Sequence, residues 1–284
     1  MATANPTAGP RSFLTYRNFR HLKLTLLGLV ASSVLYWWYE PVGGRNGGTW
    51  VGWGLGAVAF VMMLWLLYFG VRKRDYFSSS SSLQGWLSAH VYLGLGLVVL
   101  VLLHNGFQFD WNFHNLAYFL LFLVVASGTF GIFMYARVPT QMTRNRRGQR
   151  IDTMFEQLAD LDAEISSTAA GLSDFYARAS AVAITETRIG GSWIRQFSAR
   201  DPRCGTARAI KMIQDHQEPL ADSQRSDVAR IVELLGRKSA LLQRIRLDVR
   251  YRAFMEVWLF FHVPLAVASV VAVFTHIFIV FYYW

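Results

Sequence analysis

Five long apolar stretches, separated by polar and basic segments, organise the chain. They cover residues 22–39, 50–71, 83–103, 113–136 and 254–283. An α-helix needs about 20 mostly apolar residues to cross the hydrocarbon core of a bilayer, and each stretch comes near that length or exceeds it. Tryptophan and tyrosine gather at several of the ends, as is typical of rings that prefer the headgroup level. The pattern therefore predicts five transmembrane helices.

A long polar segment, residues 137–253, separates the fourth and fifth apolar stretches. Apolar residues recur in it at spacings of three and four around 155–176 and again around 228–249, which is the period of an amphipathic helix. We expect these two helices to pair as an antiparallel hairpin, with 181–225 irregular between them because it is interrupted by glycine and proline. We also expect Pro139 to break the fourth helix where it leaves the membrane.

The expected fold is therefore all-α. It is an integral membrane bundle of five transmembrane helices with a cytoplasmic helical-hairpin insertion. The chain divides into an N-terminal cytoplasmic segment (1–21), the first four transmembrane helices (22–136), the insertion (137–253) and the fifth transmembrane helix (254–284).

Basic residues predict the orientation of these helices. Arginine and lysine are concentrated before the first span, after the second, after the fourth and before the fifth, whereas the other two loops hold one basic residue, Arg45. Loops rich in Lys and Arg stay in the cytoplasm. The N-terminus and 137–253 are therefore expected in the cytoplasm and Trp284 outside, with the bacterial inner membrane as the expected location.

The composition narrows the chemistry. The chain is 53% hydrophobic and 16% charged, with a net charge of +10. Most basic residues flank the apolar spans, so we expect membrane lipid as their partner and no nucleic acid. The one cysteine, Cys204, excludes an internal disulfide and an iron–sulfur cluster, which takes four thiolates. A metal site within the spans must therefore use histidine.

Two of the predicted spans carry histidine pairs with the same spacing. His90 and His104 lie fourteen positions apart in the third span, and His262 and His276 lie fourteen apart in the fifth. Two residues fourteen positions apart in an α-helix are about 21 Å apart along its axis and point in directions that differ by about 40°. Each helix thus presents one histidine near each side of the bilayer, and the predicted topology makes the two helices parallel.

Placed side by side, these helices bring His90 level with His262 and His104 level with His276. An imidazole from each helix can then hold one iron from opposite faces, which predicts two haem b groups: an inner one between His90 and His262 and an outer one between His104 and His276. Small neighbours are expected beside a porphyrin, and Gly94 and Ala266 each follow the inner histidine by four positions.

Haem propionates are anionic, and the candidate partners for them are cations and amides. Arg72 and Arg252 are expected at the depth of the inner haem, with Arg45 or Asn105 near the outer one. Each of these residues also has an ordinary explanation as a topology or lipid-headgroup contact. A single intramembrane histidine likewise has one, as a polar contact between helices or a proton relay.

The two histidine pairs resemble the dihaem core of membrane b-type cytochromes, including the cytochrome b subunit of bc-type complexes. The resemblance covers the third to fifth spans and consists of ligand spacing. It implies that the four histidines are axial ligands and that two haems carry electrons across the membrane, with quinone as a candidate partner. The chain differs from the bc-type pattern in its long insertion and in lacking a P-E-W-Y motif.

The expected function is electron transfer, as the membrane subunit of a larger oxidoreductase complex rather than as a complete enzyme. The sequence contains neither a G-x-G-x-x-G fingerprint nor a P-loop in the insertion. Redox partners are therefore expected on separate subunits, an iron–sulfur or flavoprotein inside and a c-type cytochrome outside. The alternative is a membrane-anchored signalling or assembly protein whose cytoplasmic helices bind a partner.

Overall fold

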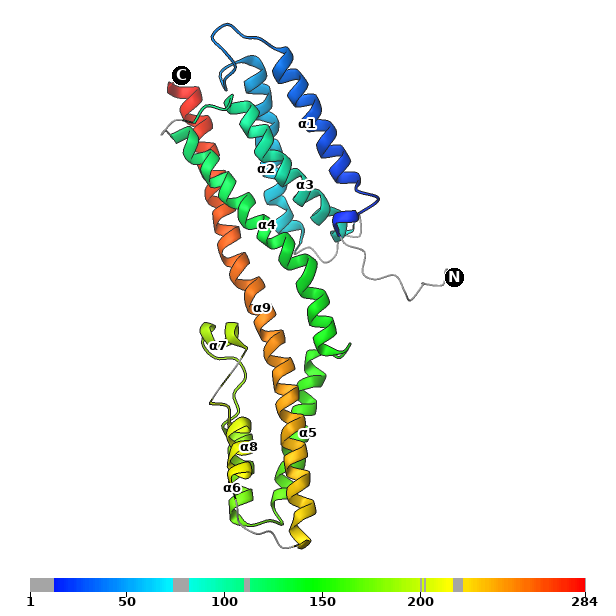
Figure 1. Ribbon diagram of the computed structural model, residues 1–284. Helices are drawn as coiled ribbons and strands as arrows, with labels where there is room; N and C mark the ends of the chain where they lie inside the picture. The colour runs from blue at the N-terminus through cyan, green and yellow to red at the C-terminus, as the bar shows by residue number, and fades with distance from the viewer. Residues whose placement is uncertain are drawn as a thin grey trace. The chain divides into compact units, whose positions relative to one another are not determined.

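Every regular element in the described part of the chain is a helix (Figure 1). The computed structural model describes residues 13–73, 82–109, 113–199, 201, 203–216 and 222–283. In chain order the elements are η1 (Phe13–Thr15), α1 (Arg20–Trp38), α2 (Trp50–Arg72), α3 (Leu83–Asn105), α4 (Phe113–Arg146), α5 (Ile151–Ala169), α6 (Asp174–Thr185), α7 (Trp193–Ser198), α8 (Gly205–Asp215) and α9 (Asp222–Tyr283). The expected all-α class is confirmed for these residues.

The chain folds into two compact units. The first comprises Met1–Ala136 with Trp258–Trp284, and the second comprises Arg137–Val257. Helices α4 and α9 contribute to both units because each runs past a boundary between them. The histidine pairs of interest all lie in the first unit.

The first unit has the character of an integral membrane protein. Among the described residues, four helices contain a segment long and apolar enough to cross a bilayer, and these segments belong to α2, α3, α4 and α9. Helix α1 has 19 residues, carries His21 and Lys23 in its first turn, and is not among those four. That α1 is a further transmembrane helix, which would make five, stays a prediction, as does the orientation of the termini.

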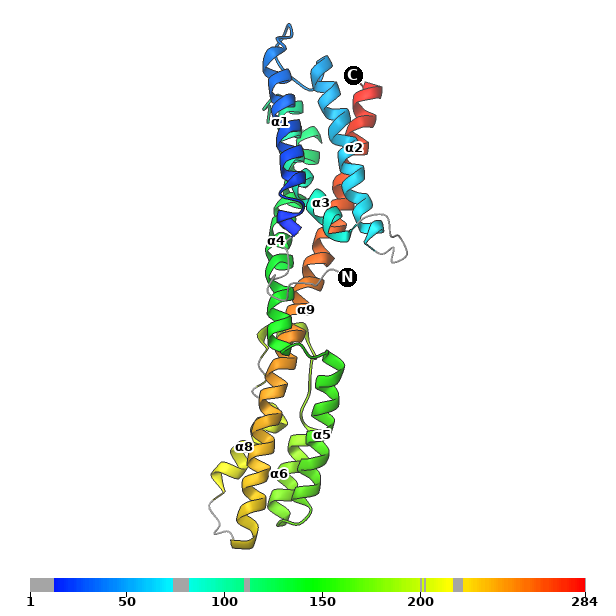
Figure 2. The ribbon, with the colours of Figure 1, turned by 90° about the vertical axis from the view of Figure 1, so that its right-hand side faces the viewer.

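Helix α3 packs against both α1 and α2, and the C-terminal part of α9 lies beside α2, where Trp53 meets Phe281 and Phe60 meets Phe274 (Figures 1 and 2). The side chains of Thr49 and Ser82 cap α2 and α3 by accepting hydrogen bonds from backbone N–H groups of the first turn. Helix α1 packs closely on α3 at Gly96, where a Cβ atom would lie 2.6 Å from Thr25 Cγ2. Apolar side chains between α2, α3, α4 and α9 form the core: Leu55, Ala59, Met63, Leu97, Leu100, Leu103, Leu121 and Val270.

The second unit has its own hydrophobic core, to which α5, α6, α8 and the first half of α9 contribute. Its central members are fully buried: Met154, Ile165, Ala179, Ala209, Ile231, Leu234, Leu235 and Ile245. The apolar stripe expected to form one helix around 155–176 is divided instead between α5 and α6, with a turn at residues 170–173. The turn folds α6 back so that one continuous stripe covers the same core from two helices.

The segment 181–225 is more regular than expected, which corrects the sequence interpretation. Helix α6 continues to Thr185, and α8 occupies Gly205–Asp215. Helix α8 buries Thr206, Ala209 and Ile213 on one face. Gly205 is required because a Cβ atom there would meet the carbonyl oxygen of Val182 in α6. Glycine in this segment therefore marks a helix boundary and a close approach.

Pro139 does not break the fourth helix, because α4 continues through it to Arg146. Proline removes one backbone hydrogen bond. The turns that follow are held by other contacts. Asn145 Nδ2 donates to the carbonyl oxygen of Arg244 at 2.6 Å, and the Arg146 guanidinium donates to both carboxylate oxygens of Asp248 at 2.6 Å each. These contacts with α9 favour the helical path beyond the proline.

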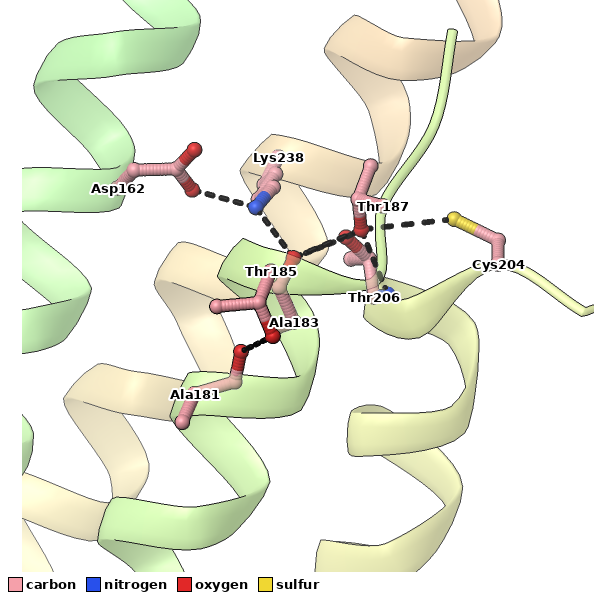
Figure 3. Close-up of polar contacts among 8 residues, drawn as sticks. All are labelled: Asp162, Ala181, Ala183, Thr185, Thr187, Cys204, Thr206 and Lys238. Carbon is pink, nitrogen blue, oxygen red and sulfur yellow. Dashed lines mark hydrogen bonds and ion pairs between the residues drawn. The ribbon is translucent and has the colours of Figure 1, made fainter. Parts of the chain in front are cut away.

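A buried polar network links four helices of the second unit, α5, α6, α8 and α9 (Figure 3). Lys238 of α9 is fully buried, and its Nζ donates to the Asp162 carboxylate of α5 and, at 2.6 Å, to the Ala183 carbonyl oxygen of α6. Thr206 and Cys204 meet Thr187 beside it. Asp162, a charged residue among the apolar positions of α5, is thus the partner of a buried lysine.

Candidate functional site

The structure brings the four histidines together in the two pairs expected from their spacing. His104 of α3 and His276 of α9 have ring centroids 6.2 Å apart and perpendicular planes, with an interplanar angle of 90°. Two imidazoles that bind one metal ion from opposite sides, each with a nitrogen about 2 Å from it, have centres about 6 Å apart. The observed separation therefore fits a shared ion, and ligation itself stays a prediction.

A backbone contact determines which nitrogen of His104 carries a hydrogen. His104 Nδ1 lies 2.8 Å from the carbonyl oxygen of Gly52 in α2. A carbonyl oxygen can only accept a hydrogen bond, so Nδ1 carries the hydrogen and the neutral ring has its lone pair on Nε2. Metal-ligating histidines typically donate their other ring N–H to such an acceptor. His104 thus has the tautomer required of a ligand.

Glycines of α2 and the preceding loop leave room for the His104 ring. A Cβ atom at Gly56 would lie 2.7 Å from His104 Cε1 and 2.8 Å from Nδ1. A Cβ atom at Gly47 would lie 3.3 Å from the same Cε1 atom. Contacts of 2.7 Å are shorter than side chains tolerate, so the position of His104 depends on the absence of a side chain at Gly56.

The second pair, His90 and His262, lines one internal cavity of about 100 Å³ in the first unit. Gly94 and Ala266, the small residues expected beside the inner haem, also line it. A Cβ atom at Gly94 would meet nothing within 4 Å, so this side of the cavity is open. Small-molecule sites usually measure about 300–1,000 Å³. The lining side chains must therefore move apart to admit a porphyrin.

The rings of this pair are held by different neighbours. His262 Nδ1 lies 2.7 Å from Ser127 Oγ of α4, and the ring stacks on Trp258 with centroids 5.1 Å apart. His90 packs against Phe69 with centroids 4.8 Å apart. Among the described residues, His90 Nδ1 is a buried polar atom with no hydrogen-bond partner. A buried polar atom without a hydrogen bond destabilises the fold unless another group makes a polar contact with it.

The two histidines of each pair match the number of protein ligands that a haem takes. Within the described ranges, no group of three or more His, Cys, Asp or Glu side chains lies close enough to hold a metal ion. Two histidines per site are what a haem leaves to the protein, because the porphyrin supplies the other four nitrogens. The open side of Gly94 agrees with this ligand set.

The structure places the expected propionate partners but does not test their roles. Arg72 lies in the last turn of α2 and is 8% exposed. Arg252 is exposed and belongs to the second unit. Their roles stay predictions. Arg45 contacts the C-terminal end of α1, since its Nε donates to the Tyr36 carbonyl oxygen at 2.9 Å and its Nη2 to that of Trp37 at 2.9 Å.

Ser127, Gly56 and Trp258 contact the candidate ligands and were not found from the sequence. The small residues at 126–128 and Gly131 in the fourth apolar stretch were the available signal, because small residues mark close helix packing in membranes. Comparisons with family models, curated proteins and solved structures give no match to this chain. The functional argument accordingly rests on the geometry of the two histidine pairs.

Proposed function

We propose that the chain is a transmembrane electron-transfer protein with two bis-histidine b-type haems. His90 and His262 are the axial ligands of the inner haem, and His104 and His276 those of the outer haem. The chain acts as the membrane cytochrome b subunit of a larger redox complex, and quinone is a candidate exchange partner. The proposed orientation places the N-terminus and 137–253 in the cytoplasm of a bacterial inner membrane.

The observation that carries the proposal is the pairing of the four rings at two levels of the same two helices. The outer rings have centroids 6.2 Å apart, and the inner rings line one cavity. Fourteen positions along α3 separate His90 from His104, which corresponds to about 21 Å of helix. That arrangement supports two separate one-iron sites along the membrane normal rather than one cluster.

The protein's own residues then have two tasks. The histidines hold the iron from both faces, which leaves no open coordination position for a substrate. Apolar side chains of α2, α3, α4 and α9 exclude water from the sites. A bound haem supplies one-electron chemistry between ferric and ferrous iron. Substrate chemistry is therefore assigned to a partner, an iron–sulfur or flavoprotein subunit inside or a c-type cytochrome outside.

The test is a haem count on the full-length protein purified in detergent. A pyridine haemochrome assay is expected to give two haem b per chain for the wild type and one for His104→Ala, with the inner haem reporting that the variant has folded. His216→Ala is the control, because His216 lies in the second unit, stacked on Phe175, and the variant should retain both haems.

A wild-type chain without haem would overturn the proposal. So would a haem content that His104→Ala leaves unchanged. Either result would favour the alternative of a membrane-anchored signalling or assembly protein.

A further inference from the structure

The contact between His262 and Ser127 has a defined direction. Ser127 Oγ lies 2.8 Å from the Val124 carbonyl oxygen of its own helix, and it donates its hydrogen there because that oxygen can only accept. A hydroxyl group has one hydrogen and two lone pairs. At 2.7 Å from His262 Nδ1, the same Oγ must therefore accept, and Nδ1 carries the hydrogen.

The direction of this bond fixes the chemistry of His262. A neutral imidazole with its hydrogen on Nδ1 has its lone pair on Nε2, the atom that binds a metal. A hydrogen bond from the opposite nitrogen also makes the imidazole a stronger electron donor. Ser127 thus controls both the tautomer and the orientation of His262 from a neighbouring helix.

The surrounding part of α4 is shaped to receive this part of α9. Trp258 Nε1 donates to the carbonyl oxygen of Ser127 at 2.8 Å, and the indole stacks on the His262 ring at an interplanar angle of 27°. A Cβ atom at Gly131 would collide with the indole, and one at Gly128 would lie 3.4 Å from His262 Cε1. Ser127, Gly128 and Gly131 of α4 therefore leave the space that Trp258 and His262 occupy.

His104 achieves the same tautomer with a backbone acceptor, the Gly52 carbonyl oxygen. No side-chain substitution deletes that acceptor. The contact of His262 depends on a hydroxyl group that one substitution removes. The two contacts therefore offer a direct comparison within one protein.

We propose that Ser127 is the positioning residue for His262, and that Trp258 holds Ser127 and the ring in register. The proposal rests on the function proposed above, because its consequence is a lower midpoint potential for the inner haem. A stronger imidazole donor stabilises ferric iron more than ferrous iron. Loss of the bond is expected to raise the potential of that haem and leave the outer haem unchanged.

The experiment compares Ser127→Ala, Ser127→Thr and Thr143→Ala in the full-length chain. Thr143 is the matched control, since its hydroxyl bonds a carbonyl of the same helix α4 but lies in the second unit. Redox titration of Ser127→Ala should show a raised midpoint potential for the inner haem and an unchanged one for the outer haem. The affinity of the inner site for haem should fall about 10- to 100-fold. Ser127→Thr restores an acceptor and should return both properties towards wild type.

A second measurement does not depend on haem. Histidine-labelled protein from cells with blocked haem synthesis should show His262 with hydrogen on Nδ1, and Ser127→Ala should show a mixture of tautomers by nitrogen-15 NMR. If the wild type holds two haems and Ser127→Ala matches Thr143→Ala in both potentials, the inference is overturned and the proposed function stands. If the wild type holds no haem, the proposed function fails, and an unchanged tautomer in Ser127→Ala overturns the positioning role as well.

Discussion

Replacing Gly56 with alanine tests whether the packing of α2 determines the position of His104. The added methyl group would lie 2.7 Å from His104 Cε1, whereas ordinary van der Waals contact begins at 3.4 Å. The ring must give way, and its movement disturbs the 2.8 Å hydrogen bond from Nδ1 to the Gly52 carbonyl oxygen. Overpacking of this kind costs about 1–3 kcal/mol. The higher helix propensity of alanine offsets about 0.5–1 kcal/mol of it.

Gly54→Ala is the matched control. Gly54 lies two residues earlier in α2, and a Cβ atom there would meet nothing within 4 Å. The same substitution should therefore leave the unfolding midpoint unchanged or raise it slightly. For Gly56→Ala we expect a lower midpoint in detergent. A penalty of about 1–3 kcal/mol also weakens the outer site about 5- to 150-fold, so one of the two haems should be lost on dilution.

Unfolding midpoints and haem counts of the two variants provide the measurement. If Gly56→Ala retains two haems per chain and matches Gly54→Ala in stability, the contact between Gly56 and the His104 ring does not position the ligand. The packing argument for the outer site would then be wrong even though the histidine pairing could stand.

Three further predictions concern other contacts. Asp162→Ala leaves the fully buried ammonium of Lys238 without its carboxylate, and breaking such a pair costs about 3–5 kcal/mol. Hydrogen exchange of the backbone amides of α6 should therefore accelerate at least about 100-fold. Unchanged exchange would contradict a stabilising role of the ion pair between Lys238 and Asp162. Burial raises the pKa of the Cys204 thiol, but the hydrogen bonds with Arg246, the Ala207 backbone and Thr187, together with the charge of Arg246, outweigh it and hold that pKa below its ordinary value. Arg246→Gln should therefore raise the pKa of Cys204 and shift the pH profile of its alkylation upwards. An unchanged profile would exclude the contact between Arg246 and Cys204. Gly96→Val should separate α1 from α3 and so lower the cross-linking yield between cysteines introduced on the two helices. An undiminished yield would show that the close packing of α1 on α3 does not depend on Gly96.

Much of the membrane part was predictable because its physical constraint is local. A span must hide all its backbone polar groups in a helix and present about 20 apolar residues to lipid. Helices α2, α3, α4 and α9 follow that pattern. Helix α1 is the weaker case, since His21 and Lys23 fall within its first turn. The polar unit was predicted less well, because α5 and α6 share one apolar stripe across a turn that periodicity does not reveal.

The pairing of His90 with His262 and of His104 with His276 was likewise predictable from spacing and loop charge. Equal intervals on two parallel helices place matching residues at matching depths, whatever the packing between them. The path of α4 through Pro139 was not predictable from the sequence. The contacts that favour it come from residues more than one hundred positions away, including Asp248.

The sequence by itself determined the helical class, the four strongly apolar spans and the equal spacing of the two histidine pairs, because hydrophobic length and helical period are properties of a single segment. Only the tertiary structure decided what surrounds those histidines. Ser127 accepts from His262, the Gly52 carbonyl oxygen accepts from His104, and Gly56 leaves that ring its space. Each of these contacts joins two helices, so it depends on the rotation and depth of both, which no pattern within either helix specifies.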